Sequence, residues 1–356
     1  MKNLSIMLKP ASSMCDMRCG YCFYTDVASK RKVPFAGLMS KETAKAIIGN
    51  VCKSLSAGDK IAFCFQGGEP GLMGLDFFEF FKNEAKAALP PGVQVSFAMQ
   101  TNGLMVDENW CEFFKANEFL VGLSLDGCAA LHNENRKDAK GQGTFSRVMR
   151  AKRLLDKHGV QYNVLSVLTA KSARMAKKTW DFILKENIRY IQFIPCLQPL
   201  GAPPGNAHLS PGRFHRFYSD LFPLWENEAK QGNVVRLRLF EDLLGIAQRG
   251  RSFTCGMEGK CAPQFVVEAD GSVYPCDFYV LDEYKACNLA EVTPKDAFDV
   301  LLAGGFFEKA PLPKWCEECP HKAWCNGGCK RMAETVYGPG CGMRRFLDEW
   351  GWFFGV

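Results

Sequence analysis

The stretch MCDMRCGYCFY, residues 14–24, holds Cys15, Cys19 and Cys22 in the spacing Cys-x3-Cys-x2-Cys, just after an alternating apolar segment. Zinc sites usually have four ligands, often in two pairs, whereas this stretch offers three cysteines and no nearby histidine. Three thiolates can hold three irons of a four-iron cubane and leave the fourth iron open to an outside ligand. The motif favours a cluster site; a zinc knuckle or a chance grouping of cysteines is the alternative.

Strand-like and helix-like segments alternate outward from this motif as far as about residue 200. Six strands joined by helical crossovers favour a parallel sheet, and six are too few to close an eight-stranded barrel. We therefore predict an α/β fold, a partial (β/α)6 barrel, with functional residues in loops at the carboxyl ends of its strands. The expected strands are residues 4–10, 60–66, 93–100, 119–126, 162–170 and 190–197, and the expected helices are 41–55 (capped by Ser40), 75–89, 107–118, 144–159 and 173–187.

The alternation stops at a Pro/Gly-rich stretch, residues 198–212, which two helical segments near 213–230 and 237–248 follow. From Cys255 onward the chain consists of short strands, turns and cysteines, and Asp270-Gly271 predicts a hairpin turn. We predict two domains: residues 1–235 form the partial barrel with its linker, and residues 236–356 form a small cysteine-rich domain.

The composition favours a cytoplasmic protein. Apolar runs such as FLVGL (119–123) are too short to cross a membrane, and the N-terminal segment has no small-residue cleavage site. Seventeen cysteines in a cytoplasmic chain need a role other than disulfide formation. The formal charge of +6 would fall to about +1 if eleven cysteines held three cubanes. Charge therefore predicts no nucleic-acid partner.

With an aromatic residue, Tyr21, before its third cysteine, the Cys-x3-Cys-x2-Cys motif resembles the signature of radical S-adenosylmethionine (SAM) enzymes. The resemblance implies a four-iron cluster bound by the three cysteines of the motif. The amino and carboxylate groups of SAM would chelate the open iron. Reduction of this cluster would split the sulfonium and release a 5′-deoxyadenosyl radical.

Other strand ends in the first domain carry further parts of this resemblance. QGGEP (66–70) resembles the GGE motif, in which Gly68 and Glu69 would receive the methionine amino group of SAM. Glycines there let the backbone approach a ligand closely, although a Gly-Gly pair alone is only a turn. Three of the implied SAM contacts also have an ordinary interpretation: Ser124 as a polar rim residue, Arg136 as a solvated charge and Leu197 as a core residue. The implied SAM contacts are Tyr21, Gly68, Glu69, Ser124, Arg136 and Leu197.

Nine cysteines follow residue 250. We interpret Cys287 as a small buried residue, and the other eight are enough for two sites of four ligands each. Two zinc ions would satisfy the same count, and spacing alone cannot separate zinc from iron–sulfur. The pattern resembles the SPASM extension of radical SAM enzymes, including its Gly-x4-Cys step from Gly271 to Cys276. The resemblance implies that Cys255, Cys261, Cys276 and Cys329 hold the nearer auxiliary cluster, and that Cys316, Cys319, Cys325 and Cys341 hold the outer one.

Over nearly its whole length, from Leu4 to Cys341, the chain resembles the anaerobic sulfatase-maturating enzymes. This resemblance rests on IMLKPASSMCDMRCGYCFY, FCFQGGEP, MQTNG, VGLSLDG and CAPQFVVEADGSVYPCDFYVL. It implies radical oxidation of a cysteine or serine in a sulfatase to Cα-formylglycine, a post-translational modification, with three [4Fe-4S] clusters and SAM as cofactors. The implied partners are an unfolded or nascent sulfatase segment and a low-potential electron donor such as flavodoxin or ferredoxin, without nucleic acid or membrane.

Two other functions fit parts of the sequence. A SPASM peptide maturase would form a thioether or another crosslink in a ribosomal peptide, and a cysteine-rich zinc module would only bind a partner. Such maturases often carry a peptide-recognition domain before the radical motif, which here begins near residue 15. We therefore favour sulfatase maturation.

Asp277 directly follows Cys276, a predicted cluster ligand. In the resembling family an aspartate at this motif position is the proposed general base, which implies that role for Asp277. An aspartate that caps a turn or faces solvent is the alternative. Gln66 and Tyr24 are predicted to orient the substrate side chain in the SAM cavity, although Tyr24 could simply be a packed aromatic residue.

Overall fold

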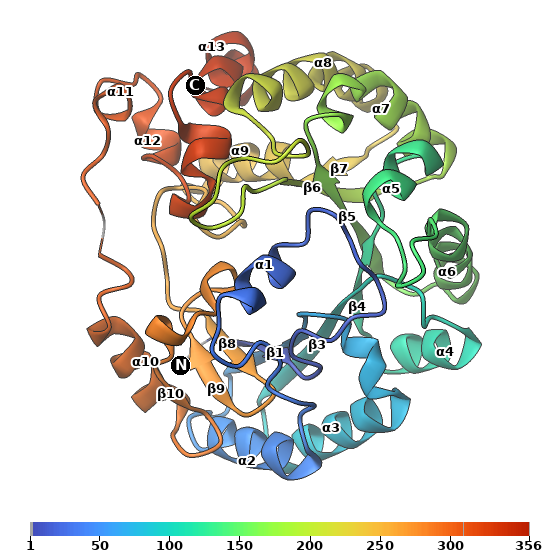
Figure 1. The fold of residues 1–356 in the computed structure, drawn as a ribbon, viewed down its shortest axis with the longest axis vertical. Helices are drawn as coiled ribbons and strands as arrows, with labels where there is room; N and C mark the ends of the chain where they lie inside the picture. The colour runs from blue at the N-terminus through green and yellow to red at the C-terminus, as the bar shows by residue number, and fades with distance from the viewer. Residues whose placement is uncertain (1–2, 309, 356) are drawn as a thin grey trace.

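The computed structural model describes residues 3–308 and 310–355, and within these ranges ten strands form one curved sheet (Figure 1). The strand order across it is β10-β9-β8-β1-β2-β3-β4-β5-β6-β7. Neighbours from β8 to β7 pair parallel, whereas β8, β9 and β10 pair antiparallel. The strands are β1 (Asn3–Lys9), β2 (Lys60–Phe65), β3 (Gln94–Thr101), β4 (Leu120–Ser124), β5 (Tyr162–Leu168), β6 (Tyr190–Pro195), β7 (Arg236–Leu237), β8 (Phe265–Glu268), β9 (Ser272–Tyr274) and β10 (Cys287–Asn288).

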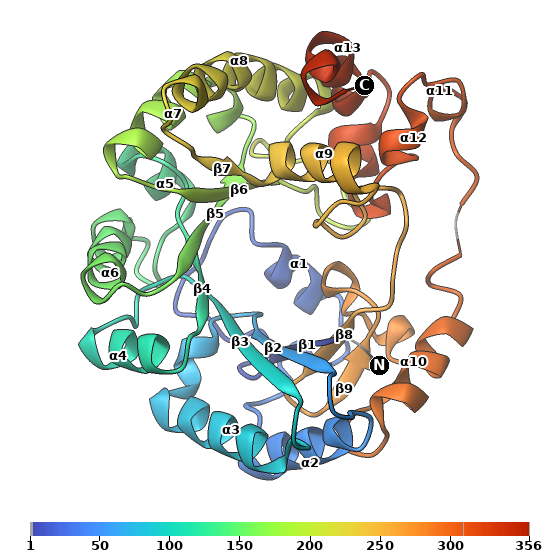
Figure 2. The ribbon, with the colours of Figure 1, turned by 180° about the vertical axis from the view of Figure 1, so that it is seen from behind.

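Helices surround the outer face of this sheet as an open ring, and α1 lies inside the ring (Figures 1 and 2). Among the described residues, no helix combines the length and the apolar character needed to cross a bilayer. The helices are α1 (Phe23–Ser29), α2 (Lys41–Cys52), α3 (Leu75–Ala88), α4 (Glu108–Ala116), α5 (Ala129–Asn135), α6 (Phe145–His158), α7 (Ala176–Lys185), α8 (Pro211–Lys230), α9 (Arg238–Arg249), α10 (Pro294–Ala303), α11 (Lys314–Glu317), α12 (Lys322–Cys325) and α13 (Gly342–Phe354).

The main core lies between the sheet and these outer helices. Phe63 and Phe65 of β2 point to the same face because strand side chains alternate, and both rings meet Phe81 of α3 edge to face. Helix α3 also buries Phe77, one turn before Phe81. The face of the central strands that points away from the outer helices, and the loops at the carboxyl ends of these strands, can therefore form a site.

The predicted partial barrel is confirmed. All six predicted strands and the five helices between them are present, and the Ser40 side chain caps α2 by accepting from the backbone N–H of Thr43, 3.0 Å away. The sequence analysis missed α1, α5 and β7, which have seven, seven and two residues. Segments this short hold too few turns or pleats to show a clear hydrophobic period. The prediction of short strands and turns after Cys255 is wrong for α10 and α13, which are helices of 10 and 13 residues.

The hairpin predicted at Asp270-Gly271 forms, and it continues the barrel sheet. β8 and β9 pair antiparallel around Gly271, whose φ is +87°. β8 in turn pairs parallel with β1, with Ile6 opposite Phe265. The predicted domains are thus joined by strand pairing, and this pairing brings the Cys276-Asp277 turn beside the end of β1. The division at residues 235 and 236 stays a prediction, and its outer bounds, residues 1 and 356, lie outside the described residues.

Candidate active site

A cavity opens at the carboxyl ends of the central strands, with about 960 Å³ of free space that is partly continuous with solvent. Its wall gathers residues from the loop after β1, the turn after β2, and the ends of β3 to β6. All of the predicted SAM and substrate positions meet here, and so do the first three cysteines. The predicted residues on this wall are Cys15, Cys19, Tyr21, Cys22, Tyr24, Gln66, Gly68, Glu69, Ser124, Arg136 and Leu197.

The first three cysteines lie on a loop at one side of this cavity. Burial raises the pKa of the Cys15 thiol to about 12 and that of Cys19 to about 11, and the neighbouring thiols add to both shifts. Ligand cysteines must be deprotonated, so a cationic group is needed to hold these sulfurs as thiolates. Three converging sulfur donors beside an open cavity fit a cubane with one open iron.

No three His, Cys, Asp or Glu side chains in residues 3–308 and 310–355 are grouped around a position for a single metal ion. A cubane does not require such a grouping. Each of its irons takes a different thiolate, so its ligand sulfurs stand farther apart than the four ligands of one zinc ion.

The Gly67-Gly68-Glu69 turn after β2 packs directly against the loop that carries the cysteines. Gly67 and Gly68 have φ values of +85° and +52°, in the region where L side chains are strained. The backbone N–H of Glu69 donates to the Met14 carbonyl, 2.8 Å away. The turn thereby fixes the loop one residue before Cys15.

We predict that Gly68→Ala destabilises the fold by about 2 kcal/mol or more. A Cβ at this position would stand 2.2 Å from the Met14 backbone oxygen. Thermal unfolding of the reconstituted protein measures the loss, and iron analysis shows whether the loop still holds its cluster. The matched control is Gly49→Ala in α2, where a Cβ meets nothing within 4 Å. A Gly68→Ala protein as stable as the parent would contradict this close packing.

Glu69 is buried and already accepts three hydrogen bonds within the protein. Its Oε1 accepts from the Gly71 N–H at 3.0 Å and the Thr101 hydroxyl at 2.8 Å, and its Oε2 accepts from the Asn102 N–H at 2.7 Å. Burial raises its pKa to about 7, and these three donors oppose the rise. A carboxylate offers about four acceptor positions. One position on Oε2 is therefore open to the methionine amino group that the sequence analysis assigned to it.

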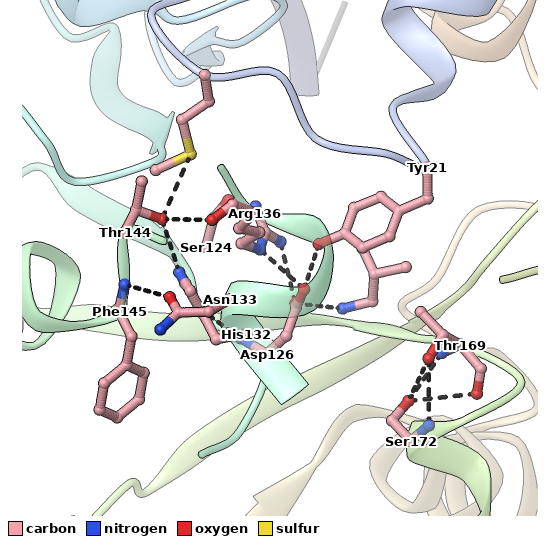
Figure 3. Close-up of polar contacts among 12 residues, drawn as sticks. Tyr21, Ser124, Asp126, His132, Asn133, Arg136, Thr144, Phe145, Thr169 and Ser172 are labelled. Carbon is pink, nitrogen blue, oxygen red and sulfur yellow. Dashed lines mark hydrogen bonds and ion pairs between the residues drawn. The ribbon is translucent and has the colours of Figure 1, made fainter. Parts of the chain in front are cut away.

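Arg136 has a partner that the sequence analysis did not foresee (Figure 3). Its Nε and Nη2 donate to the two Asp126 carboxylate oxygens, at 2.9 and 3.1 Å. The Tyr21 hydroxyl also donates to Asp126, and the Val167 N–H donates to Asp126 at 2.8 Å. The buried Asp126 thus holds Tyr21 and Arg136 at the cavity wall. Contact of Arg136 with the methionine carboxylate stays a prediction, which its remaining N–H donors would have to make.

Ser124 and Asp126 both lie at the end of β4, and the strand-end rule could have identified Asp126 as well. Ser124 accepts a hydrogen bond from the Gln100 side chain at 3.0 Å. Asp126 stands two residues further on, in the same GLSLDG stretch. Asp126 reaches Arg136 because the chain turns back through α5, a helix that the sequence pattern did not predict.

Tyr24, Gln66 and Asp277 form one hydrogen-bonded group, although they are far apart in the sequence. The Tyr24 hydroxyl donates to Asp277 Oδ2 at 2.6 Å, and Gln66 Nε2 donates to both the Tyr24 oxygen at 2.6 Å and Asp277 Oδ2 at 3.1 Å. Tyr24 and Gln66 line the cavity, and the buried Asp277 lies behind them. Burial raises the pKa of Asp277, and the charge of Lys9 opposes that rise.

A second buried group, which the sequence analysis missed, supports Asp277 from the other side. Lys9 Nζ lies 3.8 Å from Asp277 Oδ1 and 3.6 Å from Glu268 Oε1. Arg31 donates to the same Glu268 oxygen at 2.8 Å. Lys9 ends β1 and Glu268 ends β8, so the parallel pairing of these strands places the two charges side by side.

The eight later cysteines influence one another within the two sets that the resemblance named, and the binding of a cluster by each set stays a prediction. Burial raises the pKa of Cys276 to about 12, and Cys329 and Cys255 raise it further. Burial also raises the pKa of Cys329, and the nearby Cys261 thiol adds to that rise. Burial also raises the pKa of Cys325 to about 12, with added effects from Cys341, Cys319 and Cys316. These last four line a second, smaller pocket.

Residues 10–172 match the family model of the radical SAM superfamily. The cysteine-type anaerobic sulfatase-maturating enzyme of Clostridium novyi is 38% identical over 99% of this chain and 95% of its own length. The chain belongs to the anaerobic sulfatase-maturating enzymes. The cysteine-type enzyme of Clostridium perfringens is also 38% identical, whereas the serine-type enzyme of Klebsiella aerogenes is 29% identical over 91% of this chain and 79% of its own.

Solved structures agree with this family. The structure described as native anSMEcpe with bound AdoMet and Kp18Cys peptide superimposes with a TM-score of 0.91 at 36% identity, over 99% of this chain and 98% of that one. SuiB of Streptococcus suis, bound to precursor peptide SuiA, gives a TM-score of 0.66 at 17% identity, over 96% and 75% of the two chains. That likeness shows a shared fold alone. The predicted family, fold class and radical SAM enzyme class are confirmed for this anaerobic sulfatase-maturating enzyme.

Proposed function

We propose that this enzyme oxidises a cysteine or serine side chain in a sulfatase polypeptide to Cα-formylglycine. The observation that carries the proposal is the Tyr24–Gln66–Asp277 group, in which Tyr24 and Gln66 line the cavity and hydrogen-bond to the buried Asp277 carboxylate behind them, next to Cys276. Membership of the sulfatase-maturating family supports it. The higher identity to the cysteine-type relatives favours cysteine as the target. The proposed setting is the cytoplasm, with a low-potential carrier such as flavodoxin or ferredoxin as the electron donor.

Three [4Fe-4S] clusters and SAM are the cofactors that the residues fit. Cys15, Cys19 and Cys22 would hold the cluster that binds SAM, and the two later groups of four cysteines would hold the auxiliary clusters. SAM would contact Tyr21, Ser124 and Leu197 in the cavity, in addition to Gly68, Glu69 and Arg136. When bound, these cofactors supply a 5′-deoxyadenosyl radical that takes one hydrogen atom from the substrate Cβ, and an acceptor at Cys276 for one electron.

The side chains of this enzyme handle the proton. Forming a C=S or C=O bond at Cβ also requires loss of the thiol or hydroxyl proton of the substrate. Asp277 is the base, and the Tyr24 hydroxyl lies between it and the cavity, 2.6 Å from Asp277 Oδ2. A proton can pass to the Tyr24 oxygen while the Tyr24 proton moves to Asp277. Lys9, 3.8 Å from Asp277 Oδ1, stabilises the ionised carboxylate that receives it.

The oxidation conserves atoms and electrons for both a serine and a cysteine target. A serine loses one hydrogen atom, one proton and one electron, and becomes the aldehyde directly. A cysteine loses the same three particles to give a thioaldehyde, and water then replaces sulfur and releases hydrogen sulfide. A crosslinking maturase would instead keep the sulfur in the peptide. Mass spectrometry after incubation with a cysteine-containing sulfatase-motif peptide therefore tests the proposal, since an unchanged or crosslinked peptide contradicts it.

We predict that Gln66→Ala reduces peptide turnover about tenfold or more while the affinity for SAM changes little. Its amide donates to both Tyr24 and Asp277, so its loss frees the groups that face the substrate side chain. Single-turnover formation of formylglycine measures the first effect, and equilibrium binding of SAM measures the second. Ser124→Ala, at a predicted SAM contact across the cavity, is the matched variant and should weaken SAM binding more. Equal losses for Gln66→Ala in both measurements would place Gln66 in the SAM site.

A further inference from the structure

The loop that carries the first three cysteines reaches the protein surface at two residues that do not line the SAM cavity. Arg18 and Gly20, which flank Cys19 on either side, are exposed. Under the proposed function, on which this inference rests, the first cluster needs one electron from outside for each cleavage of SAM. A donor that covers Arg18 and Gly20 would approach this cluster without entering the cavity.

A short hairpin at residues 137–143 extends this exposed face. The Arg18 N–H donates to the Lys137 carbonyl at 2.7 Å, and the Gly20 N–H donates to the Asn135 carbonyl at 3.0 Å. Met17 and Asp138 form an antiparallel bridge, and so do Lys137 and Gly143. The hairpin and the cluster loop are thus held together by backbone bonds and form one continuous surface.

This surface is positively charged. Four exposed basic side chains, those of Arg18, Lys137, Lys140 and Arg147, lie on the cluster loop, on the hairpin and at the start of α6. The hairpin itself carries one carboxylate, that of Asp138, and the nearby Glu134 is paired with Lys171 at 3.1 Å. Arg147 pairs with Asp138 at 2.5 Å, whereas no carboxylate in the described part of the chain lies within ion-pairing distance of Lys137 or Lys140.

Arg18 connects this charge to the cluster loop itself. Its Nη1 donates to the carbonyl oxygens of Cys15 and Met17, at 2.6 and 2.8 Å. The guanidinium therefore lies over the backbone that holds the first cysteine, and its charge stands between that backbone and solvent.

We propose that this basic surface, formed by Arg18, Lys137, Lys140 and Arg147, is the docking site for a small acidic one-electron carrier protein. Opposite charges steer two proteins into encounter and fix their relative orientation. Transient redox complexes use small interfaces and exchange rapidly, which suits a donor that delivers one electron and leaves. The carrier is oxidised by one electron, and the first cluster is reduced by one; no proton or group is transferred.

The test uses the reconstituted holoenzyme with SAM, and with reduced flavodoxin or dithionite as alternative donors. Its first readout is 5′-deoxyadenosine in the absence of any sulfatase peptide, so the outcome does not depend on formylglycine chemistry. Its second readout is the Kd for oxidised flavodoxin, which should rise together with the KM. We expect Lys137→Glu/Lys140→Glu to raise the KM for flavodoxin about tenfold or more at low salt, with an unchanged dithionite-driven rate. The flavodoxin-driven rate of the parent should fall steeply as salt increases, and that of the variant should not.

Lys45→Glu/Lys86→Glu provides the matched control, because it changes the charge equally on exposed residues of α2 and α3. A flavodoxin KM raised equally in both double variants, or unchanged in Lys137→Glu/Lys140→Glu, overturns the proposal. If the dithionite-driven rate also falls, the double variant has disturbed the cluster loop. Lys140→Glu alone, next to the open turn at Gly141, then decides: an unchanged flavodoxin KM in that variant overturns the proposal.

Discussion

A Cys15→Ala/Cys19→Ala/Cys22→Ala variant is expected to form no 5′-deoxyadenosine and to keep about two thirds of the iron of the parent protein. The three cysteine groups would hold about 12 irons per chain as cubanes, and only the first group lines the SAM cavity. The eight later cysteines lie in two separate groups, so their iron should remain. Iron and sulfide analysis after anaerobic reconstitution gives the first quantity, and chromatography of the nucleoside products gives the second.

A matched control for this variant replaces cysteines that lie outside the three groups. Cys52→Ala/Cys64→Ala alters two thiols that no predicted cluster uses, and this variant should keep its full iron content and SAM cleavage. If the first triple variant still released 5′-deoxyadenosine, the assignment of the radical chemistry to this loop would be wrong. Complete loss of iron would instead show that the three groups do not fill independently.

Replacing Asp277 with Asn is expected to slow formylglycine formation at least about a hundredfold, the usual scale for loss of a general base. Asparagine keeps the shape of the side chain and an oxygen that can accept from Tyr24, but it cannot take up the substrate proton. Iron content and 5′-deoxyadenosine formation should match those of the parent, because Asp277 lies behind Tyr24 and Gln66 rather than on the SAM wall. Single-turnover assays that score the peptide aldehyde by mass measure the loss.

Tyr24→Phe separates two roles for the same group. If the Tyr24 hydroxyl relays the proton, its removal should slow aldehyde formation by a factor similar to that of Asp277→Asn. If Asp277 accepts the proton directly, Tyr24→Phe should have the smaller effect expected of a lost hydrogen bond. Near-normal aldehyde yield from fully reconstituted Asp277→Asn protein would rule out Asp277 as the base.

The strands and helices of the barrel could be predicted because the signals for them are local. Alternation such as that in KIAFCFQ and the capping residue Ser40 act within a few residues of the elements they define. The positions of Gln66 and Ser124 followed as well, because parallel strands end at one edge of the sheet and their following loops meet there.

The side-chain partners of the site residues could not be predicted, because their contacts join parts of the chain that no local pattern links. The pairing of β1 with β8 joins residues about 260 apart, Ile6 and Phe265, and no periodicity encodes such a contact. Lys9 and Glu268 become neighbours only through this pairing, and Asp126 meets Arg136 only through the turn of α5. Buried charges need partners, but the sequence does not indicate which of its many charges will be buried.

A labelling experiment tests directly whether this enzyme oxidises a sulfatase side chain at Cβ. The reconstituted enzyme is incubated with SAM, a reductant and a sulfatase-motif peptide whose target cysteine carries two deuterium atoms at Cβ. We expect one deuterium in 5′-deoxyadenosine for each peptide converted, with the other retained on the aldehyde carbon and the sulfur released as sulfide. A product peptide that keeps its sulfur in a crosslink, or 5′-deoxyadenosine without deuterium, would contradict this expectation.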